Sequence, residues 1–293
     1  MKQKKIFNYD EVFMGVFQDR PKGFYKDTYK EKPELRRIID MVNVKKGRML
    51  DIGSGGGYLS ECLPFFYPRV RIFGCDVSKS AIKYAKKFGT GKVHYKTMDK
   101  KLPYPSNYFD VCICTDVLEH IPDVPYFLND VRRILKKDGV FFLSIPCEGQ
   151  PYTLHWLLRK IGIWKNLTFK HVGHIHSEFT HEYIIRLFQN HGFTVLAKKY
   201  NERWLVQLFR YTLFMIPKEI LESVIGRRKA EQYYDRNVVV KDQRSAKDIF
   251  MHVRILWFKM FQFTKILNYI DAEYLTDVSF AAGKIFLLVR NDK

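Results

Sequence analysis

Glycines gather at one point of the sequence, where their spacing has a chemical use. Residues 53–57 read GSGGG and directly follow the apolar run RMLDI. Glycine has no Cβ, so backbone amides at Gly53, Gly55 and Gly57 can approach a ligand closely, and the start of the next helix faces the same space. Asp76 follows 23 residues after Gly53, at the end of the next apolar run, where a carboxylate can bind both hydroxyls of a ribose. The pattern predicts a nucleoside-like ligand; a tight turn without a ligand is the alternative.

A second group of residues able to do chemistry is rich in histidine. The stretch DVLEH contains Asp116, Glu119 and His120, and GHIHSEFTH contains His174 and His176. Imidazole titrates near neutral pH, so His120 could act as a general base; bracing of a loop is the other interpretation. We expect His174 and His176 to lie on a loop that faces the substrate. Because HExxH and cysteine pairs are absent, we predict no metal site.

The elements that position these residues alternate regularly. Apolar runs typical of strands occur at 48–53, 69–76, 92–99, 108–116, 140–146 and 193–200, and helical patterns at 34–42, 58–66, 78–88, 124–139 and 180–192. Alternation of this kind predicts an α/β fold: a doubly wound, mostly parallel sheet with helices on both faces. Ligands of such sheets bind beyond the carboxyl ends of the strands. The glycine cluster and the residues after the fourth strand therefore belong to one edge.

The end of the chain departs from simple alternation. A last strand pattern lies within 278–293, and residues 201–277 separate it from the sixth strand. This segment is rich in aromatic residues and predicts a helical insertion: a packed subdomain, a lid over the acceptor, or an interfacial helix at 252–270 on an anionic membrane. We assign residues 45–200, together with the last strand at 278–293, to the core. We expect residues 1–44 to form a cap beside the substrate pocket.

Composition narrows the class of protein. The net charge of +19 is spread along the chain (+2 over 1–35, +7 over 36–150, +3 over 151–197, +7 over 198–293), which favours a solvated surface over a nucleic-acid footprint. The five cysteines form no CxxC pair and indicate a reducing, cytoplasmic location. No signal peptide is visible, and no apolar run reaches the ~18 residues of a membrane span.

Four motifs in register carry a family resemblance. LDIGSGGGYLS, GCDVS, MDKKLPYPSNYFDVCICTDVLEHIPD and VRRILKKDGVFFLSIP follow one another. A dinucleotide fingerprint would need a third glycine at Tyr58. Over roughly 45–200 the chain instead resembles class I S-adenosylmethionine-dependent methyltransferases, especially the subgroup of the ubiquinone/menaquinone C-methyltransferases. The resemblance implies a seven-stranded, Rossmann-like sheet and S-adenosylmethionine as cofactor.

The same resemblance implies roles for individual residues. Its cofactor-binding positions are Asp51, Gly53, Ser54, Gly55 and Gly57 at the methionine end, Asp76 at the ribose, Val77, Met98 and Asp99 at the adenine, and Thr115 and Asp116 between cofactor and substrate. We expect methyl transfer to a small or lipid-linked acceptor. A sugar or glycan acceptor and a cofactor-binding protein without catalysis are the alternatives. A nucleic-acid substrate is not expected, because TDVLEH stands where amino-methylating nucleic-acid enzymes carry [DNS]PP[YFW].

Overall fold

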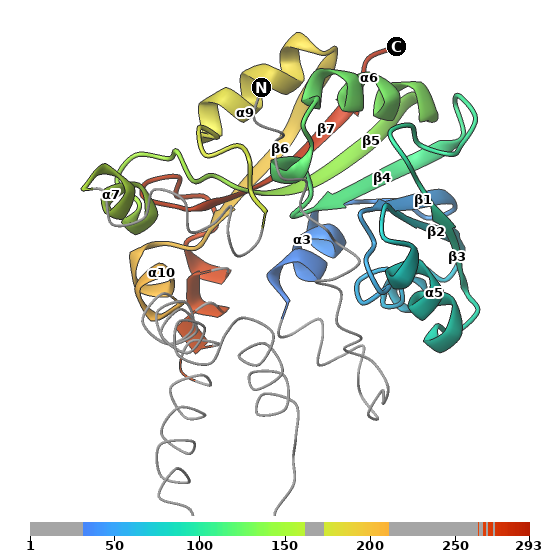
Figure 1. The fold of residues 1–293 in the computed structure, drawn as a ribbon, viewed down its shortest axis with the longest axis horizontal. Helices are drawn as coiled ribbons and strands as arrows, with labels where there is room; N and C mark the ends of the chain where they lie inside the picture. Colours follow the sequence, from blue (N-terminus) through green and yellow to red (C-terminus); the bar gives the residue numbers. More distant parts are fainter. Residues whose placement is uncertain (1–31, 162–172, 211–262, 264–265, 268, 272) are drawn as a thin grey trace, which may run out of the picture.

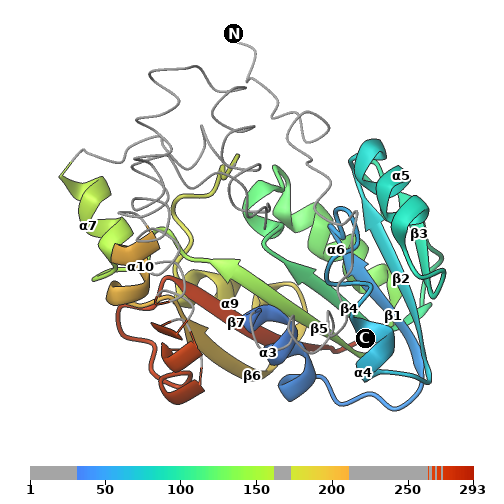
Figure 2. The same cartoon turned by 90° about the horizontal axis from the view of Figure 1, so that it is seen from below.

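A seven-stranded sheet is the centre of the computed structural model, which describes residues 32–161, 173–210, 263, 266–267, 269–271 and 273–293 (Figures 1 and 2). The strand order is β3-β2-β1-β4-β5-β7-β6, and β7 runs antiparallel to both of its neighbours. The predicted fold class is confirmed. The strands are β1 (Gly47–Ile52), β2 (Val70–Asp76), β3 (Val93–Thr97), β4 (Phe109–Thr115), β5 (Leu135–Pro146), β6 (Phe193–Asn201) and β7 (Lys284–Asn291).

Helices cover both faces of this sheet, with α6 and α9 on one face and α3 and α5 on the other (Figure 1). Alternate residues of the central strands enter two separate cores: Leu50 of β1 packs with the α6 side, and Met49 with the α3 and α5 side. The helices are α3 (Pro33–Met41), α4 (Leu63–Phe66), α5 (Lys79–Phe88), α6 (Val124–Ile134), α7 (Leu154–Lys160), α9 (His181–Asn190) and α10 (Trp204–Arg210), with the 3-10 helix η1 at Leu118–His120.

Two helices begin directly after a side chain that caps them, at the starts of the helical patterns 78–88 and 180–192. The Ser78 hydroxyl accepts a hydrogen bond from the amide of Ala81 at 3.1 Å, and the Thr180 hydroxyl accepts one from the amide of Tyr183 at 3.1 Å. Each side chain satisfies an amide that the helix itself leaves unpaired. The capping residue Ser78 stands two residues after Asp76 and fixes the start of α5 at Lys79, and so fixes the exit of the chain from β2.

Two predicted helices are shorter than expected. Residues 58–62 form turns, and only Leu63–Phe66 is helical, with Pro64 in its first turn. Helix α6 ends at Ile134 instead of Gly139, because Leu135 is fully buried and pairs with Phe109 at the start of β5. Pairing with β4 therefore overrides the helix propensity of LKKD.

One edge of the sheet collects the groups that the sequence predicts to be functional. The carboxyl ends of β1 to β5 lie along it because these strands are parallel. β6 ends there as well, whereas the antiparallel β7 begins there with Lys284. We call this edge the carboxyl edge.

The segments outside the predicted core are only partly described. Helix α3 of the predicted cap buries Leu35 and Ile38 in the core, and α10 begins the segment between β6 and β7. Most of 201–277, including most of 252–270, lies outside the described residues, so the helical insertion stays a prediction. Within the described residues, no helix combines the length and the apolarity that crossing a membrane requires.

Candidate functional site

The glycine turn between β1 and α4 combines two kinds of glycine. A Cβ at Gly53 would collide with the side chain of Val117, and one at Gly57 with the hydroxyl of Tyr95, so protein packing alone requires these two glycines. Gly55 also has a positive φ of 50°, yet an added Cβ there would have no atom within 4 Å among the described residues. The space beside Gly55 is open, and a ligand can approach the backbone at this point.

Asp76 organises the same turn through its carboxylate. One oxygen accepts a hydrogen bond from the amide of Gly55 at 2.8 Å, and the other accepts one from the amide of Ser78 at 2.8 Å. The amides of Gly53 and Ser54 donate to the carbonyl of Cys75 at 2.8 and 3.0 Å. The carboxylate predicted to bind a ribose therefore lies directly beside the open space at Gly55.

Asp51 is a buried carboxyl group at the end of β1. It accepts a hydrogen bond from the Ser60 hydroxyl at 2.5 Å. Burial, reinforced by the charge of Asp76 and opposed by the Ser60 hydrogen bond, raises the pKa of Asp51 to about 7. A cationic ligand group beside Asp51 would favour its charged form.

The remaining predicted cofactor residues follow β2, β3 and β4. Val77 is exposed, as is Asp99, while Thr115 is half-buried. Met98 is buried; its amide donates to the carbonyl of Asp76 at 2.9 Å, and its sulfur lies 3.6 Å from that of Cys75. The fold thus brings the ends of β2 and β3 together, and the contacts of these residues with a cofactor remain predictions.

The open space has polar groups suited to a polar ligand. The Ser54 hydroxyl is buried and has no hydrogen-bond partner among the residues that the structure describes. In the sequence Ser54 directly precedes Gly55, whose amide donates to Asp76, and it follows Asp51 by three residues. A nucleoside linked to an amino acid, as in S-adenosylmethionine, offers hydroxyls and an ammonium group to these acceptors, so the residues present fit the implied cofactor.

A buried lysine, Lys284, joins three segments at the carboxyl edge, on the side of β4 to β7. The ammonium group of Lys284 lies 2.7 Å from Glu34 of α3, 2.8 Å from Asp116 after β4, and 3.9 Å from Glu202 after β6. Burial lowers the pKa of Lys284, but the three carboxylates outweigh it and the net shift is upward. For Glu34, burial raises the pKa, but the charge of Lys284 and its hydrogen bond outweigh burial and the pKa falls to about 2. We call these four residues the Lys284 cluster.

Asp116 takes a backbone conformation that is rare outside glycine, with φ at 54°. Its amide donates to the carbonyl of Ser144 at 2.9 Å, and the Ser144 hydroxyl donates to its carboxylate at 3.3 Å. β5 and Lys284 therefore hold this conformation together. Strain of this kind is common where a side chain is positioned for binding.

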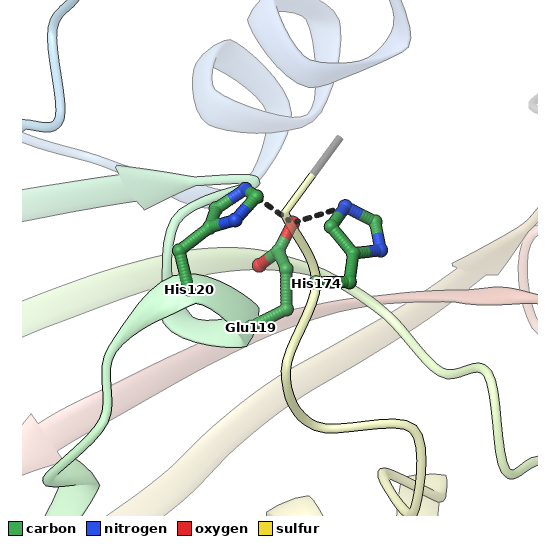
Figure 3. A group of neighbouring side chains, drawn as sticks. All are labelled: Glu119, His120 and His174. Carbon is green, nitrogen blue, oxygen red and sulfur yellow. Dashed lines mark ion pairs between the residues drawn. The ribbon is translucent and has the colours of Figure 1, made fainter. Parts of the chain in front are cut away.

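The histidine group meets around Glu119, which lies between His120 and His174 (Figure 3). Its Oε1 is 3.8 Å from His120 Nε2 and 3.6 Å from His174 Nε2. Glu148, after β5, binds His174 Nδ1 at 2.5 Å and lies 3.4 Å from His155. Two histidines that are 54 residues apart, His120 and His174, thus converge on one buried carboxyl group.

The protonation of this group follows from its burial. Burial and the neighbouring His174 lower the pKa of His120 to about 4, so His120 is neutral and weakly basic at pH 7. Burial and the charge of Asp116 raise the pKa of Glu119. Burial raises the pKa of Glu148, but the hydrogen bonds of His155 and His174 outweigh it and lower the pKa to about 2. The role of His120 as a general base therefore stays a prediction, and its low pKa makes it a weak base.

His176 has a different setting from His174. Its Nε2 lies 2.8 Å from the carbonyl of Ile121, its Nδ1 lies 2.9 Å from Glu178, and its ring stacks on Phe179. Both ring nitrogens brace the loop. Contact of His176 with a substrate stays a prediction.

Several residues of the edge were not identified from the sequence: Glu34, Glu148, Glu202 and Lys284. Glu148 follows an apolar strand, so the rule that selected Asp116 after β4 could have found it. Lys284 is a single charge at the head of an apolar strand, which is a weaker signal. Glu34 and Glu202 gave no local signal, because only the fold brings them to Lys284.

Comparison with known proteins gives consistent results. A family model described as "Methyltransferase domain" matches residues 28–198. The ubiquinone biosynthesis O-methyltransferase of Pelagibacter ubique is 27% identical over 169 residues (53% of this chain, 65% of the relative), and that of a Bradyrhizobium species is 32% identical over 145 residues (45% and 56%). The chain thus spans less than two thirds of the length of these curated relatives.

Solved structures resemble the fold. Phosphoethanolamine N-methyltransferase 2 of Haemonchus contortus, in complex with S-adenosyl-L-methionine, has a TM-score of 0.54 at 16% identity and covers 99% of this chain and 61% of its own. The YcgJ protein of Bacillus subtilis has a TM-score of 0.52 at 18% identity, covering 89% and 98%. At these identities the likeness supports the architecture alone.

Proposed function

The chain belongs to the methyltransferase-domain family, and from this premise we propose that it transfers a methyl group from S-adenosylmethionine to a small or lipid-linked acceptor. The observation that carries the proposal is the open space beside Gly55, adjoining the carboxylate of Asp76. Asp51, Ser54 and the amides of 53–57 would hold the methionine end, Asp76 the ribose, and Val77, Met98 and Asp99 the adenine. When bound, the cofactor supplies a methyl group activated by a sulfonium.

The protein's own contribution would be alignment of the acceptor and control of its proton. Thr115 ends β4 and Asp116 follows it as a member of the Lys284 cluster, and both side chains would face the cofactor and the acceptor. His120 is the side chain we assign to proton removal, although its low pKa makes it a weak base at pH 7.

The class of acceptor is proposed from the relatives and from the charge of the edge. The curated relatives are named for ubiquinone biosynthesis, which supports an oxygen on a small or lipid-linked molecule. The Lys284 cluster and Glu148 make the half of the edge formed by β4 to β7, which we call the acceptor half because we place the acceptor there, strongly polar. That polarity favours a second candidate, a sugar or glycan intermediate, over a purely apolar acceptor.

We also propose a cytoplasmic location with peripheral membrane contact. Five free, buried cysteines suit a reducing compartment. Exposed apolar side chains support the contact: Phe263 and Ile266 belong to the predicted interfacial helix, and Leu205 and Leu208 to α10. Salt-sensitive co-sedimentation with anionic, but not neutral, vesicles checks it, and equal recovery with both would contradict it.

Calorimetry with S-adenosylmethionine and with NAD tests the central proposal. We expect the wild-type chain to bind the sulfonium and not NAD. Asp76→Ala should lose charge-assisted hydrogen bonds of about 1.5–3 kcal/mol and so weaken binding on the order of 10- to 100-fold. Asp76→Asn, which keeps one acceptor oxygen for the amide of Gly55, is the matched control and should lose less. Tight binding of NAD alone would overturn the assignment.

A further inference from the structure

The carboxyl group of Glu119 is buried just after the end of β4. Its side chain is 1% exposed, and neither carboxylate oxygen has a hydrogen-bond donor among the described residues. A buried carboxyl group without a partner destabilises the folded state. The Nε2 atoms of His120 and His174 lie 3.8 and 3.6 Å from Oε1 of Glu119, beyond hydrogen-bond distance (Figure 3).

Both imidazoles are oriented from behind by acceptors. His174 Nδ1 lies 2.5 Å from Glu148, and since a carboxylate only accepts, this nitrogen carries the proton. His120 Nδ1 lies 3.2 Å from the carbonyl of Gly173, which likewise requires a proton on Nδ1. The other nitrogen of each ring, Nε2, lies on the side of Glu119 (Figure 3). A histidine that donates its Nδ1 proton to a carboxylate or a carbonyl is the usual arrangement behind a metal ion.

We propose that Glu119, His120 and His174 bind one divalent first-row transition cation, for which Zn²⁺ is the probe, with Glu148 as a positioning residue for His174. The three ligand atoms lie within 4.8 Å of one another. Two ligands at ~2.1 Å from a tetrahedral ion stand about 3.4 Å apart, so the rings need to close by little more than 1 Å. Two nitrogen ligands favour Zn²⁺, Fe²⁺ or Ni²⁺ over Mg²⁺ or Ca²⁺.

The expectation of no metal from the sequence rested on motifs whose ligands are adjacent along the chain. Here two ligands are in η1 and the third follows 54 residues after His120, so the fold alone assembles the set. The side chains of His120 and His174 are each 16% exposed, which leaves a coordination position reachable from outside. That position suits an oxygen of the acceptor, a role that rests on the proposed function, whereas metal binding itself does not. In the metal-bound protein this role replaces proton removal by His120, because a ring coordinated through Nε2 and protonated at Nδ1 has no basic nitrogen left.

Binding is tested on the full chain after removal of metal with a chelator. Titration with Zn²⁺ is followed by calorimetry, and titration with Co²⁺ by its visible absorption. We expect one equivalent to bind, loss of at least 100-fold in affinity in Glu119→Gln and His174→Gln, and loss of 10- to 100-fold in Glu148→Gln. His94→Gln is the matched control, because His94 is exposed on the edge strand β3 and is not one of the three grouped residues, and it should bind as the wild type does.

Glu119→Gln also separates this proposal from a protonated carboxyl group that needs no ion. The amide keeps the shape and removes the buried charge, so the metal-free variant should melt at or above the wild-type temperature while its response to Zn²⁺ disappears. Absence of Zn²⁺ binding in the wild type, or binding that Glu119→Gln and His174→Gln leave unchanged, would overturn the site. Binding of S-adenosylmethionine to metal-free protein is measured separately, so failure of the metal site and failure of the proposed function are distinguishable.

Discussion

The two halves of the carboxyl edge hold their polar groups in different ways. In the half formed by β1, β2 and β3, the carboxylate of Asp76 is bound by backbone amides, and the turn is shaped by glycines. In the half formed by β4 to β7, Lys284 is bound by carboxylates from α3 and from the ends of β4 and β6. The first half is assembled within about 25 residues, and the second from segments up to 250 residues apart.

This difference suits two different tasks. A turn made of backbone amides presents the same groups whatever the neighbouring side chains are, which is appropriate for one invariant cofactor. Charged side chains from distant segments can be exchanged one at a time, which is appropriate for a variable acceptor. Damage to the two halves should therefore have different consequences: loss of cofactor binding in the first and loss of stability in the second.

Lys284→Met should give the largest effect. It leaves Glu34 and Glu202 without the cation that compensates them, and breaking a buried ion pair costs about 3–5 kcal/mol. Because Asp116 is 44% exposed, we expect the lower end, about 3 kcal/mol. At ~2–4 °C per kcal/mol the melting temperature should fall by roughly 6–12 °C, as measured by differential scanning calorimetry.

Lys199→Met is the matched control for this substitution. Lys199 stands on the neighbouring strand β6 and pairs with the exposed Asp277 at 2.7 Å. An exposed pair contributes at most about 1 kcal/mol. Equal melting temperatures for the two variants would show that the Lys284 cluster does not hold α3 to the sheet.

Gly55→Val should remove cofactor binding and leave the acceptor half intact. Valine disfavours the positive φ and places a branched side chain in the open space. We expect at least a 100-fold loss of S-adenosylmethionine affinity by calorimetry, about 2.7 kcal/mol. Gly91→Val is the matched control, because Gly91 also has a positive φ, 77°, and open space beside it, in an exposed loop before β3. Both variants should lose stability alike; normal binding by Gly55→Val would mean that the loop is only a turn.

The predictability of the two halves follows from the same difference. The strands, the glycine turn, Asp76 and the cap at Ser78 were predictable because each depends on neighbours in sequence. The end of α6 was not, because pairing of Leu135 with Phe109 decides it. The convergence of Glu34 and Glu202 on Lys284 was not predictable either, since side-chain contacts across the sheet leave no periodic signal.

The smallest effect is expected from pH, acting on Asp51. Its pKa is raised to about 7 in the folded protein, from 3.8. Between these values the folded state binds more protons than the unfolded state, so this group's contribution is complete below about pH 4 and is lost as pH rises to about 7. Asp51→Asn has no such loss. Its melting temperature should equal that of the wild type near pH 4 and exceed it above pH 7.

The size of this gain is limited by two opposing effects. One pKa unit corresponds to about 1.4 kcal/mol, but asparagine also gives up the charge-assisted hydrogen bond from Ser60. We therefore expect about 1–2 kcal/mol, or roughly 2–8 °C. Asp138→Asn, with an exposed side chain, is the control and should show no gap that grows with pH. Saturation with S-adenosylmethionine should reverse the order of Asp51→Asn and wild type above pH 7, because an ammonium group beside Asp51 would compensate the charge that asparagine lacks. A gap unchanged by the ligand would separate Asp51 from the cofactor and confine the first half of the edge to Asp76 and the glycine turn.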